Sequence, residues 1–475
     1  MDSTSPGIKT GHPPGSWREL VQVAWPLVIS AGSFSLMFVA DRIFLTWDST
    51  DAMAAAGASG VLHWTVISLF LGTALYVNTF VAQYEGAKQP RRVGAAVWQG
   101  VYFAIAAGLL VAAVGPFSDR IFAALGHAPK VQVLESEYFS ILCYGTPPML
   151  LSAALACYFS GRRRTMAIMW VNLLSTGTDL VLDYPMIHGW GPFPELGIRG
   201  AAITNVIGSF VAVTAYLLLM LRDREGRRYG LWTEWRLDGE LFRRLLKFGM
   251  PSGIQFLIDG VCFTMFIQLV GRIGEQELAA TNLAFVLNML VFVPILGLNT
   301  AIMTLTGQRI GEGRPELAVR TTWIAFGIAE IYTLCFALVY VLRPEWFLAI
   351  CRWQADAADF QPLERHVVVL LRFVAVYSLF DVMTVTFGAA LRGAGDTRFV
   401  LVFSSLAGFF LMVLPTYLAI EYGGGMIGAW WAVTAFIVTL GVGFFLRFRG
   451  GKWQRMRVIE TIEEETDPEL AEAAV

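Results

Sequence analysis

Long apolar runs recur along the chain and are separated by short polar connections. Each run has 18 or more residues, which is long enough for a helix to cross about 30 Å of hydrocarbon. Backbone amides have no water partner in lipid, so each run is expected to be helical. The pattern therefore predicts an all-α integral membrane protein with about twelve transmembrane helices. The predicted spans are 20–46, 53–81, 93–115, 133–160, 166–188, 198–221, 246–271, 278–306, 318–342, 366–391, 398–420 and 425–447.

Basic residues alternate between the two ends of these spans. Arginine and lysine gather in the connections after the second, fourth, sixth and eighth spans and after the last one, as in Arg162–Arg164 and the long connection 222–245. The first connection on the other side carries Asp48 and Asp51 and no basic residue. By the positive-inside rule, both termini are expected on the cytoplasmic side of a cell (inner) membrane. That topology requires an even number of spans, which agrees with twelve.

The chain contains an internal repeat. Aligning Met53–Trp98 with Leu278–Trp323 at an offset of 225 gives twelve identities in 46 ungapped positions, against about four expected from composition. A second block relates SGRRRT (160–165) to RGAGDT (392–397). Six spans return to the starting side, so the two six-helix bundles should be parallel repeats with an axis along the membrane normal and a cavity between them. The matched pairs include Gln83 with Gln308, Gly86 with Gly311, and Pro90 with Pro315, and both prolines suit the first turn of the following helix.

This repeat divides the chain into two lobes and three polar parts. The acidic end, EEETDPELAEAAV, lacks aromatic residues and is typical of a disordered cytoplasmic tail. The predicted parts are a cytoplasmic N-terminal segment 1–19, an N-terminal lobe 20–221, a cytoplasmic linker 222–245, a C-terminal lobe 246–447 and a tail 448–475.

Composition narrows the class further. The chain is 56% hydrophobic and only 15% charged, with a formal net charge of −2, so nothing favours a nucleic-acid partner. Its five cysteines show no paired spacing, which argues against a disulfide framework or a zinc site. We expect the lipid bilayer and a small organic molecule as partners, and a protein that functions as a monomer.

Aspartates inside the spans are the candidate functional residues. An ionisable side chain at bilayer depth is costly and usually marks an ion or substrate path. The alternative is that each is capped by a neighbouring hydroxyl or arginine and is only structural; Asp41 has Arg42 beside it, and Asp183 could lie at the interface. The five intramembrane positions are Asp41 in the first span, Asp179 and Asp183 in the fifth, Asp259 in the seventh and Asp381 in the tenth.

Several of these residues lie in motifs that resemble the multidrug and toxic compound extrusion (MATE) family. The likeness runs from Pro26 to about Phe445 and includes VAQYEGA, GIRGAA, GMPSGIQFLID, LAATN and ALRGAGDT in order. The resemblance implies two six-helix bundles and antiport of organic, often cationic, compounds against H⁺ or Na⁺. It implies no enzyme activity and no cofactor other than the coupling ion. Pro26 matches a proline implicated in bending of the first helix.

The resemblance also suggests site residues in the N-terminal lobe. Asp41 matches the family's first-helix carboxylate, Tyr138 a tyrosine that lines that site, and Asp183 the fifth-helix aspartate. Thr204 stands where the sixth helix usually provides a hydroxyl. Asp41 and Asp183 are thus a possible Na⁺ site. The sequence departs from the family at Asp179, where an asparagine is usual.

The C-terminal lobe carries candidates of its own. Asp259 takes the place of an acidic residue, usually glutamate, eight positions after the helix proline, and Asp381 matches the tenth-helix aspartate of the sodium-linked branch. Since both lobes carry carboxylates, the coupling ion and the lobe that couples stay open.

The aspartates one helical turn apart suggest a mechanism. Asp179 and Asp183 share a helix face, and two carboxylates this close in a dry bundle cannot easily both ionise. We therefore expect the pair to hold one proton near neutral pH and to exchange it for a cationic compound or Na⁺.

Three other functions are compatible with the same spans. A lipid-linked saccharide flippase of the same wider superfamily would tend to place arginine or lysine in the cavity, whereas the midspan charges here are acidic. A membrane-embedded transferase would need a sizeable ordered loop, and a channel would not need two lobes with single acidic sites. The antiporter is the interpretation that the residues favour.

Overall fold

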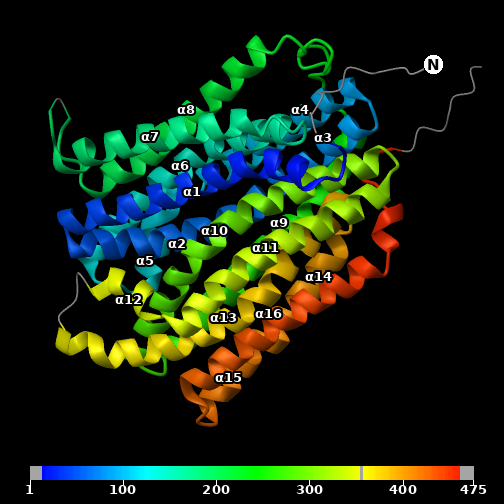
Figure 1. The fold of residues 1–475 in the computed structure, drawn as a ribbon. Coiled ribbons are helices and arrows are strands. Elements are labelled where there is room, and N and C mark those ends of the chain that lie inside the picture. Colours follow the sequence, from blue (N-terminus) through cyan, green and yellow to red (C-terminus); the bar gives the residue numbers. More distant parts are fainter. Residues whose placement is uncertain (1–12, 192, 353–356, 461–475) are drawn as a thin grey trace, which may run out of the picture.

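The computed structural model describes residues 13–191, 193–352 and 357–460, and this part of the chain is helical with no strand (Figure 1). Twelve helical stretches are long and apolar enough to cross a membrane, which confirms the predicted count. The helices of the first lobe are α1 (Trp17–Asp48), α2 (Thr50–Leu75), α3 (Val77–Gly86), α4 (Pro90–Ala112), α5 (Ser118–Leu125), α6 (Pro129–Ser160), α7 (Thr165–His188) and α8 (Ile198–Arg222). Those of the second are α9 (Gly239–Gly271), α10 (Glu275–Gly311), α11 (Pro315–Leu342), α12 (Glu345–Arg352), α13 (Ala357–Ala394), α14 (Thr397–Ala407), α15 (Leu414–Glu421) and α16 (Gly425–Arg449).

Helix packing repeats from lobe to lobe. In the first lobe α6 packs against α4 and α8, and in the second α13 packs against α11 and α16. The first helix of each lobe packs inside its own lobe and also across to the other one: α1 contacts α7 and α10, and α9 contacts α14 and α2. The predicted repeat is therefore a true structural repeat, related by a pseudo-twofold axis between the lobes.

Glycines allow the closest approaches across this axis. A Cβ on Gly72 of α2 would lie 2.8 Å from the Cα of Gly253 in α9. A Cβ on Gly297 of α10 would lie 2.6 Å from the backbone nitrogen of Val28 in α1. The offset of 225 relates Gly72 to Gly297 and Val28 to Gly253, so the two contacts are equivalent in the repeat. A side chain at any of these glycines would push the two helices of that contact apart.

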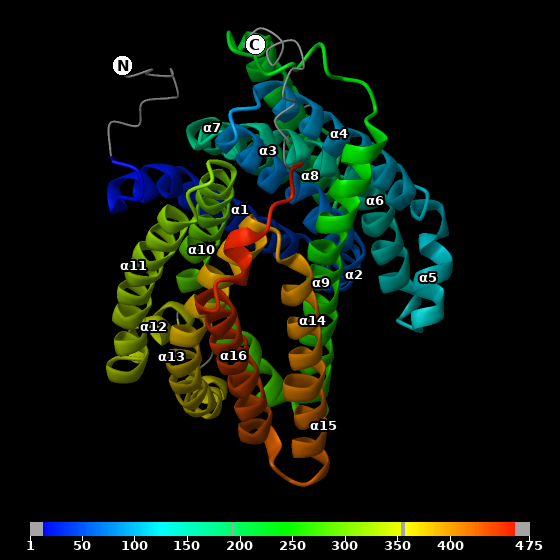
Figure 2. The ribbon, with the colours of Figure 1, turned by 90° about the vertical axis from the view of Figure 1, so that its right-hand side faces the viewer.

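The two lobes meet most closely at one end of the molecule, which we call the basic end. It comprises residues 86–90, 160–165, 222–239, 311–315, 394–397 and 449–460, and it carries both ends of the described chain (Figures 1 and 2). Pro90 and Pro315 open α4 and α11 there, as the sequence predicts. The short helices α5 and α12 lie in connections at the opposite end, and neither is predicted by the sequence.

The polar parts differ from their predicted bounds. The linker is shorter than predicted, because α8 extends to Arg222 and α9 begins at Gly239. The start of the predicted tail is ordered: after α16, a 3₁₀-helix spans Lys452–Arg455, and the side chains of Trp453, Val458 and Ile459 are buried. The acidic stretch at 463–475 lies outside the described residues.

Candidate functional site

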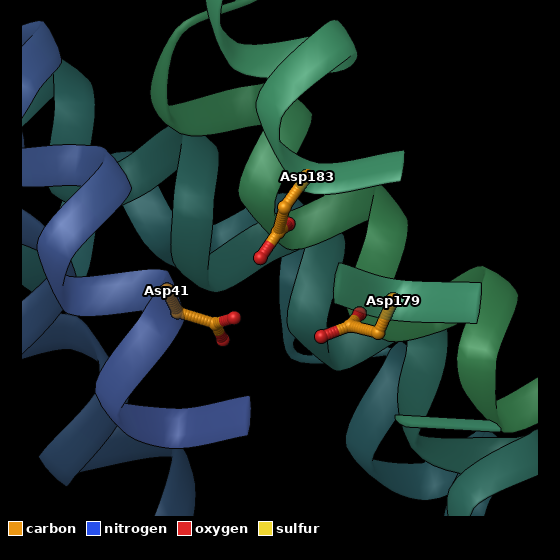
Figure 3. A group of neighbouring side chains, drawn as sticks. All are labelled: Asp41, Asp179 and Asp183. Atoms are coloured by element: carbon orange, nitrogen blue, oxygen red, sulfur yellow. The ribbon is translucent and has the colours of Figure 1, made fainter. Parts of the chain in front are cut away.

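Three aspartates meet inside the N-terminal lobe. Asp41 projects from α1, Asp179 and Asp183 project from α7, and their carboxylates converge on one space (Figure 3). One oxygen of each lies within 4.8 Å of the others. The exposed fraction is 7% for Asp41 and zero for the other two. The predicted pair of α7 is therefore a triad with the predicted carboxylate of α1.

The helices explain this convergence. Asp179 and Asp183 are four residues apart, so they lie on one face of α7. That face packs against both α1 and α8. Because α1 crosses this face at the level of Asp41, the triad forms from the contact between the first and fifth spans.

Only part of the triad is hydrogen-bonded. The Thr204 hydroxyl donates to Asp183 Oδ1, and Asn205 Nδ2 donates to Asp41 Oδ2 at 3.1 Å. Within the described chain, four buried oxygens have no hydrogen-bond partner: Asp41 Oδ1, Asp183 Oδ2 and both carboxylate oxygens of Asp179. The Thr204 hydroxyl therefore contacts the triad, and its role in coupling stays a prediction. The sequence analysis missed Asn205, although a second polar residue next to Thr204 in an apolar span is a readable signal.

Two of the structural alternatives for these carboxylates do not fit, whereas Asp183 does have the capping hydroxyl of Thr204 on one oxygen. Arg42 is exposed, its guanidinium lies 5.1 Å from the centre of the Phe38 ring, and it forms no ion pair with Asp41. Asp183 is fully buried in the lobe and does not lie at an exposed interface. Tyr138 of α6 is 8% exposed and lies within electrostatic range of all three aspartates, and its role at the site stays a prediction.

The triad can hold a cation or protons. Three buried carboxylates at this spacing cannot all carry a charge unless a positive charge compensates them. The four oxygens without a hydrogen-bond partner, together with the Thr204 hydroxyl, offer the all-oxygen ligand set that hard cations prefer. Protonation of the carboxylates would relieve the same repulsion.

Asp259 of the C-terminal lobe has a different environment, with an amide donor and a positive charge nearby. Asp259 of α9 accepts a hydrogen bond from Gln255 Nε2 at 3.3 Å, and the same amide lies 3.3 Å from the Ser404 hydroxyl of α14. Arg392 of α13 lies close enough for its positive charge to act on Asp259, and its guanidinium donates to Asn299 Oδ1 at 3.0 Å. The sequence analysis did not connect Arg392 with Asp259, because the two residues are far apart in the sequence and come near each other only in the fold.

Asp381 lies apart from this group. In the described part of the chain it forms no hydrogen bond or ion pair, and none joins it to Asp259. Tyr377, one turn away on α13, lies close enough to be influenced by its charge. The two aspartates predicted for the C-terminal lobe therefore do not form a joint cluster.

Pro26 lies buried inside α1, which is one continuous helix from Trp17 to Asp48. Its predicted role in bending stays a prediction.

Two parallel six-helix repeats with a carboxylate cluster buried between spans define a multi-pass membrane transporter. The chain belongs to the MatE family, whose model matches residues 26–185 and 251–418, one match in each lobe. This is a family of transporters and not of enzymes.

Its relatives extend over nearly the whole chain. A probable multidrug resistance protein NorM of Thermotoga maritima is 24% identical over 449 residues, which cover 93% of this chain and 94% of that protein. The protein of the same name from Rhodopseudomonas palustris is 28% identical over 84% of this chain and 85% of its own length.

Solved structures share the fold. A multidrug resistance MATE family transporter of the MOP superfamily, solved in an outward-facing conformation, aligns with a TM-score of 0.86 at 20% identity, covering 97% of this chain and 100% of that one. A MOP superfamily transporter from Pyrococcus furiosus, whose binding pocket is described as of reverse polarity, aligns with a TM-score of 0.85 at 20% identity over 94% of this chain and 98% of that one.

Proposed function

We propose that the protein is a secondary active antiporter that exports organic, cationic and amphipathic compounds in exchange for H⁺ or Na⁺. The single observation that carries this proposal is the aspartate triad with its four unpartnered buried oxygens. A site of this kind needs positive charge from outside the protein. The names of the relatives, multidrug resistance proteins, support the same reading.

Exchange follows if ion and cargo cannot occupy the N-terminal lobe together. In the proposed cycle, protons or Na⁺ bind among Asp41, Asp179 and Asp183 and compensate their negative charge, and a cationic compound leaves because its electrostatic attraction to the site is weakened. Each charge that moves inward gains about 2.3 kcal/mol per 100 mV of membrane potential, and an ion gradient adds to this.

Contacts between the lobes at the basic end support alternating access. Gln83 Nε2 of the first lobe donates to the Gly393 carbonyl of the second at 3.0 Å, and Gln308 Nε2 donates back to the Gly161 carbonyl at 2.7 Å. We name these two bonds the glutamine clasp. Gln83 corresponds to Gln308 in the repeat, and Gly161 corresponds to Gly393. Each glutamine therefore bonds the glycine of the opposite lobe, and both bonds would break when the lobes rock apart.

A buried ion pair strengthens the same closure. Glu19 of α1 accepts hydrogen bonds from Arg309 of α10 at 2.5 Å and from Arg163 at 2.7 Å, and it is 1% exposed. We propose that the basic end faces the cytoplasm, with both termini there, in a cell membrane. The structure is then the state that is closed toward the cytoplasm.

The deciding experiment is transport by the purified protein in proteoliposomes. A fluorescent organic cation is loaded, and a Na⁺ gradient and a pH gradient are imposed separately. Flux that follows one gradient, and that is abolished by Asp41→Asn, supports the proposal and identifies the ion. Asp51→Asn is the matched control, because Asp51 is half-exposed and paired with Lys130 away from the triad.

A lipid-linked saccharide flippase is the second candidate, and Arg392 is the residue that favours it. It is a half-buried arginine in the last turn of α13, and a pyrophosphate-bearing lipid would need such a positive charge. Its charge is already opposed by Asp259, however. Absence of cation flux under both gradients, with translocation of an anionic lipid that depends on Arg392, would replace the antiporter proposal.

A further inference from the structure

A hollow lined by arginines lies on the N-terminal lobe at the basic end, far along the chain from the triad. It has a volume of about 490 Å³ and no acidic residue in its lining. One wall is the start of α4 and the other is the linker between the lobes. The lining residues are Gln89, Pro90, Arg91, Arg92, Arg227 and Arg228.

Most of this positive charge is unmatched. Arg92 pairs with Asp238 at 2.9 Å. Arg91, Arg227 and Arg228 are exposed, and none forms an ion pair with any residue in the described ranges. Arginines that only fixed the topology of the chain would not need to converge on one hollow. The convergence favours an anion with several oxygens, which guanidinium groups bind with good geometry.

The linker is fixed against α4 and does not hang free in water. Its turn at Gly230 packs on Gly94, where a Cβ would come within 2.9 Å of the Gly230 carbonyl carbon. Trp98 Nε1 then donates to the Leu231 carbonyl at 2.6 Å, and the Tyr102 hydroxyl donates to the Trp235 carbonyl.

This path carries the linker along the side of α4. Tyr102 lies twelve residues beyond Pro90, so the linker follows α4 for about 18 Å from the helix start. Along this stretch Trp232, Trp235 and Leu237 are 44%, 55% and 63% exposed. Exposed tryptophans beside a span are typical of the membrane–water interface. The exposed tryptophans thus indicate that the arginine hollow lies near the level of lipid headgroups, beside a surface that also carries the exposed Arg236.

We infer that this hollow is a binding site for an anionic phospholipid. Its phosphate lies among Arg91, Arg227 and Arg228, and its acyl chains lie along the exposed side chains of Trp232 and Trp235. Basic pockets next to spans on the cytoplasmic side bind anionic headgroups for the same electrostatic reason. The inference depends neither on the cargo nor on the coupling ion, so its failure would leave the proposed transport function standing.

Lipid binding to the detergent-purified protein tests this site. Phosphatidylglycerol, phosphatidylcholine and inorganic pyrophosphate are titrated separately, with native mass spectrometry and thermal unfolding as readouts. We expect phosphatidylglycerol alone to bind and stabilise. The triple variant R91Q/R227Q/R228Q should weaken it on the order of 100-fold, since each arginine near a surface contributes roughly fivefold.

The matched control removes three exposed arginines from the same end of the other lobe, R398Q/R449Q/R455Q. None of the three lines the hollow or forms an ion pair with a described residue. It should bind phosphatidylglycerol as the native protein does. If both triple variants bound phosphatidylglycerol equally weakly, the effect would come from the overall positive charge of this end, and the proposed site would be wrong. Equal stabilisation by pyrophosphate would replace the lipid with a soluble anion.

A second readout does not depend on the folding of the triple variant. Phosphatidylglycerol brominated on its acyl chains quenches nearby tryptophans, and the quenched fraction is compared between the native protein and Trp235→Phe. A smaller quenched fraction in Trp235→Phe is expected. An unchanged fraction would contradict the predicted position of the acyl chains.

Discussion

The two lobes share one helix arrangement but differ in how they compensate buried charge. In the N-terminal lobe, three aspartates face one another without a cation among the described residues. In the C-terminal lobe, Asp259 has an amide donor and the nearby charge of Arg392. At the offset of 225, Asp41 corresponds to Phe266, and Asp259 corresponds to Phe34. The repeat therefore preserves packing, while each lobe has its own chemistry.

This difference assigns separate tasks. Asp259 has a positive charge nearby in its own lobe and Asp381 is a single carboxylate. The three carboxylates of the triad, by contrast, repel one another and need positive charge from solution. We therefore expect coupling to reside in the N-terminal lobe. The predictions below test that division, beginning with the largest effect.

Asp41→Asn should lower antiport on the order of 100-fold, because a lost charge-assisted interaction is worth up to about 3 kcal/mol. The control is the double variant Asp259→Asn/Arg392→Gln, which removes two opposite charges from the other lobe and should retain most of the activity. Transport in proteoliposomes measures both. If the double variant lost activity as completely as Asp41→Asn, the division between the lobes would be wrong.

The triad should hold a shared proton in the absence of a bound cation. Infrared titration between about pH 5 and 9 should show a protonated carboxyl band, because neighbouring buried carboxylates cannot all ionise. The band should vanish in Asp179→Asn/Asp183→Asn and persist in Asp381→Asn. A spectrum that both substitutions on α7 leave unchanged would sink the hypothesis.

Substituting the two glutamines of the glutamine clasp should change the conformational equilibrium by different amounts. Gln83 also accepts a hydrogen bond from the Val458 backbone N–H at 2.9 Å, whereas Gln308 Oε1 has no partner among the described residues. Gln83→Ala should therefore shift the population toward the state open at the basic end by several-fold, and Gln308→Ala by about threefold, given about 0.6 kcal/mol per intramembrane hydrogen bond.

Spin labels at Lys88→Cys and Arg314→Cys would report this shift as a change in the distance distribution between the lobes. Both positions lie at the basic end, one in each lobe. Equal shifts for Gln83→Ala and Gln308→Ala would show that the Val458 contact contributes nothing to closure.

The smallest effect concerns acid stability at the basic end. Burial alone would raise the pKa of Asp223, but hydrogen bonds from Arg162 and Tyr158 lower that pKa from 3.8 to about 2. A lowered pKa in the folded state stabilises the protein above the ordinary value, and this contribution is lost as the pH falls from about 4 to about 2. Thermal unfolding of Asp223→Asn should lack this loss. The Asp396–Arg447 pair of the other lobe is left intact as an internal reference.

Much of the fold could be predicted from the sequence, because lipid allows few backbone solutions. The twelve spans, the repeat and the prolines that open α4 and α11 follow from run length and identity alone. The short helices α5 and α12 could not be predicted, since they depend on contacts outside the membrane. The packing of residues 450–460 against the lobes was not predicted, because the sequence of a polar segment does not indicate which surface it will pack on.

The candidate site was predictable in its members but not in its partners. Asp41, Asp183 and Thr204 were expected from the resemblance, and Asp179 was marked as a departure from it. That Asn205 supports Asp41 and that Arg392 opposes Asp259 depends on how helices distant in sequence meet. Side-chain pairs between helices form only when the lobes pack, and the similar composition of the apolar spans does not show which helices will be neighbours.

The ordered segment after α16 has a consequence for how the protein is made. Val458 donates its backbone N–H to Gln83, its carbonyl accepts from Arg244 at 2.9 Å, and the Tyr84 hydroxyl donates to Glu460 at 2.7 Å. These partners lie in the first lobe and in the first turns of the second, all translated long before residue 458. The ribosome must therefore finish both lobes before the last contacts between them can form. A chain truncated within α16 would contain all of the earlier helices but lack these hydrogen bonds.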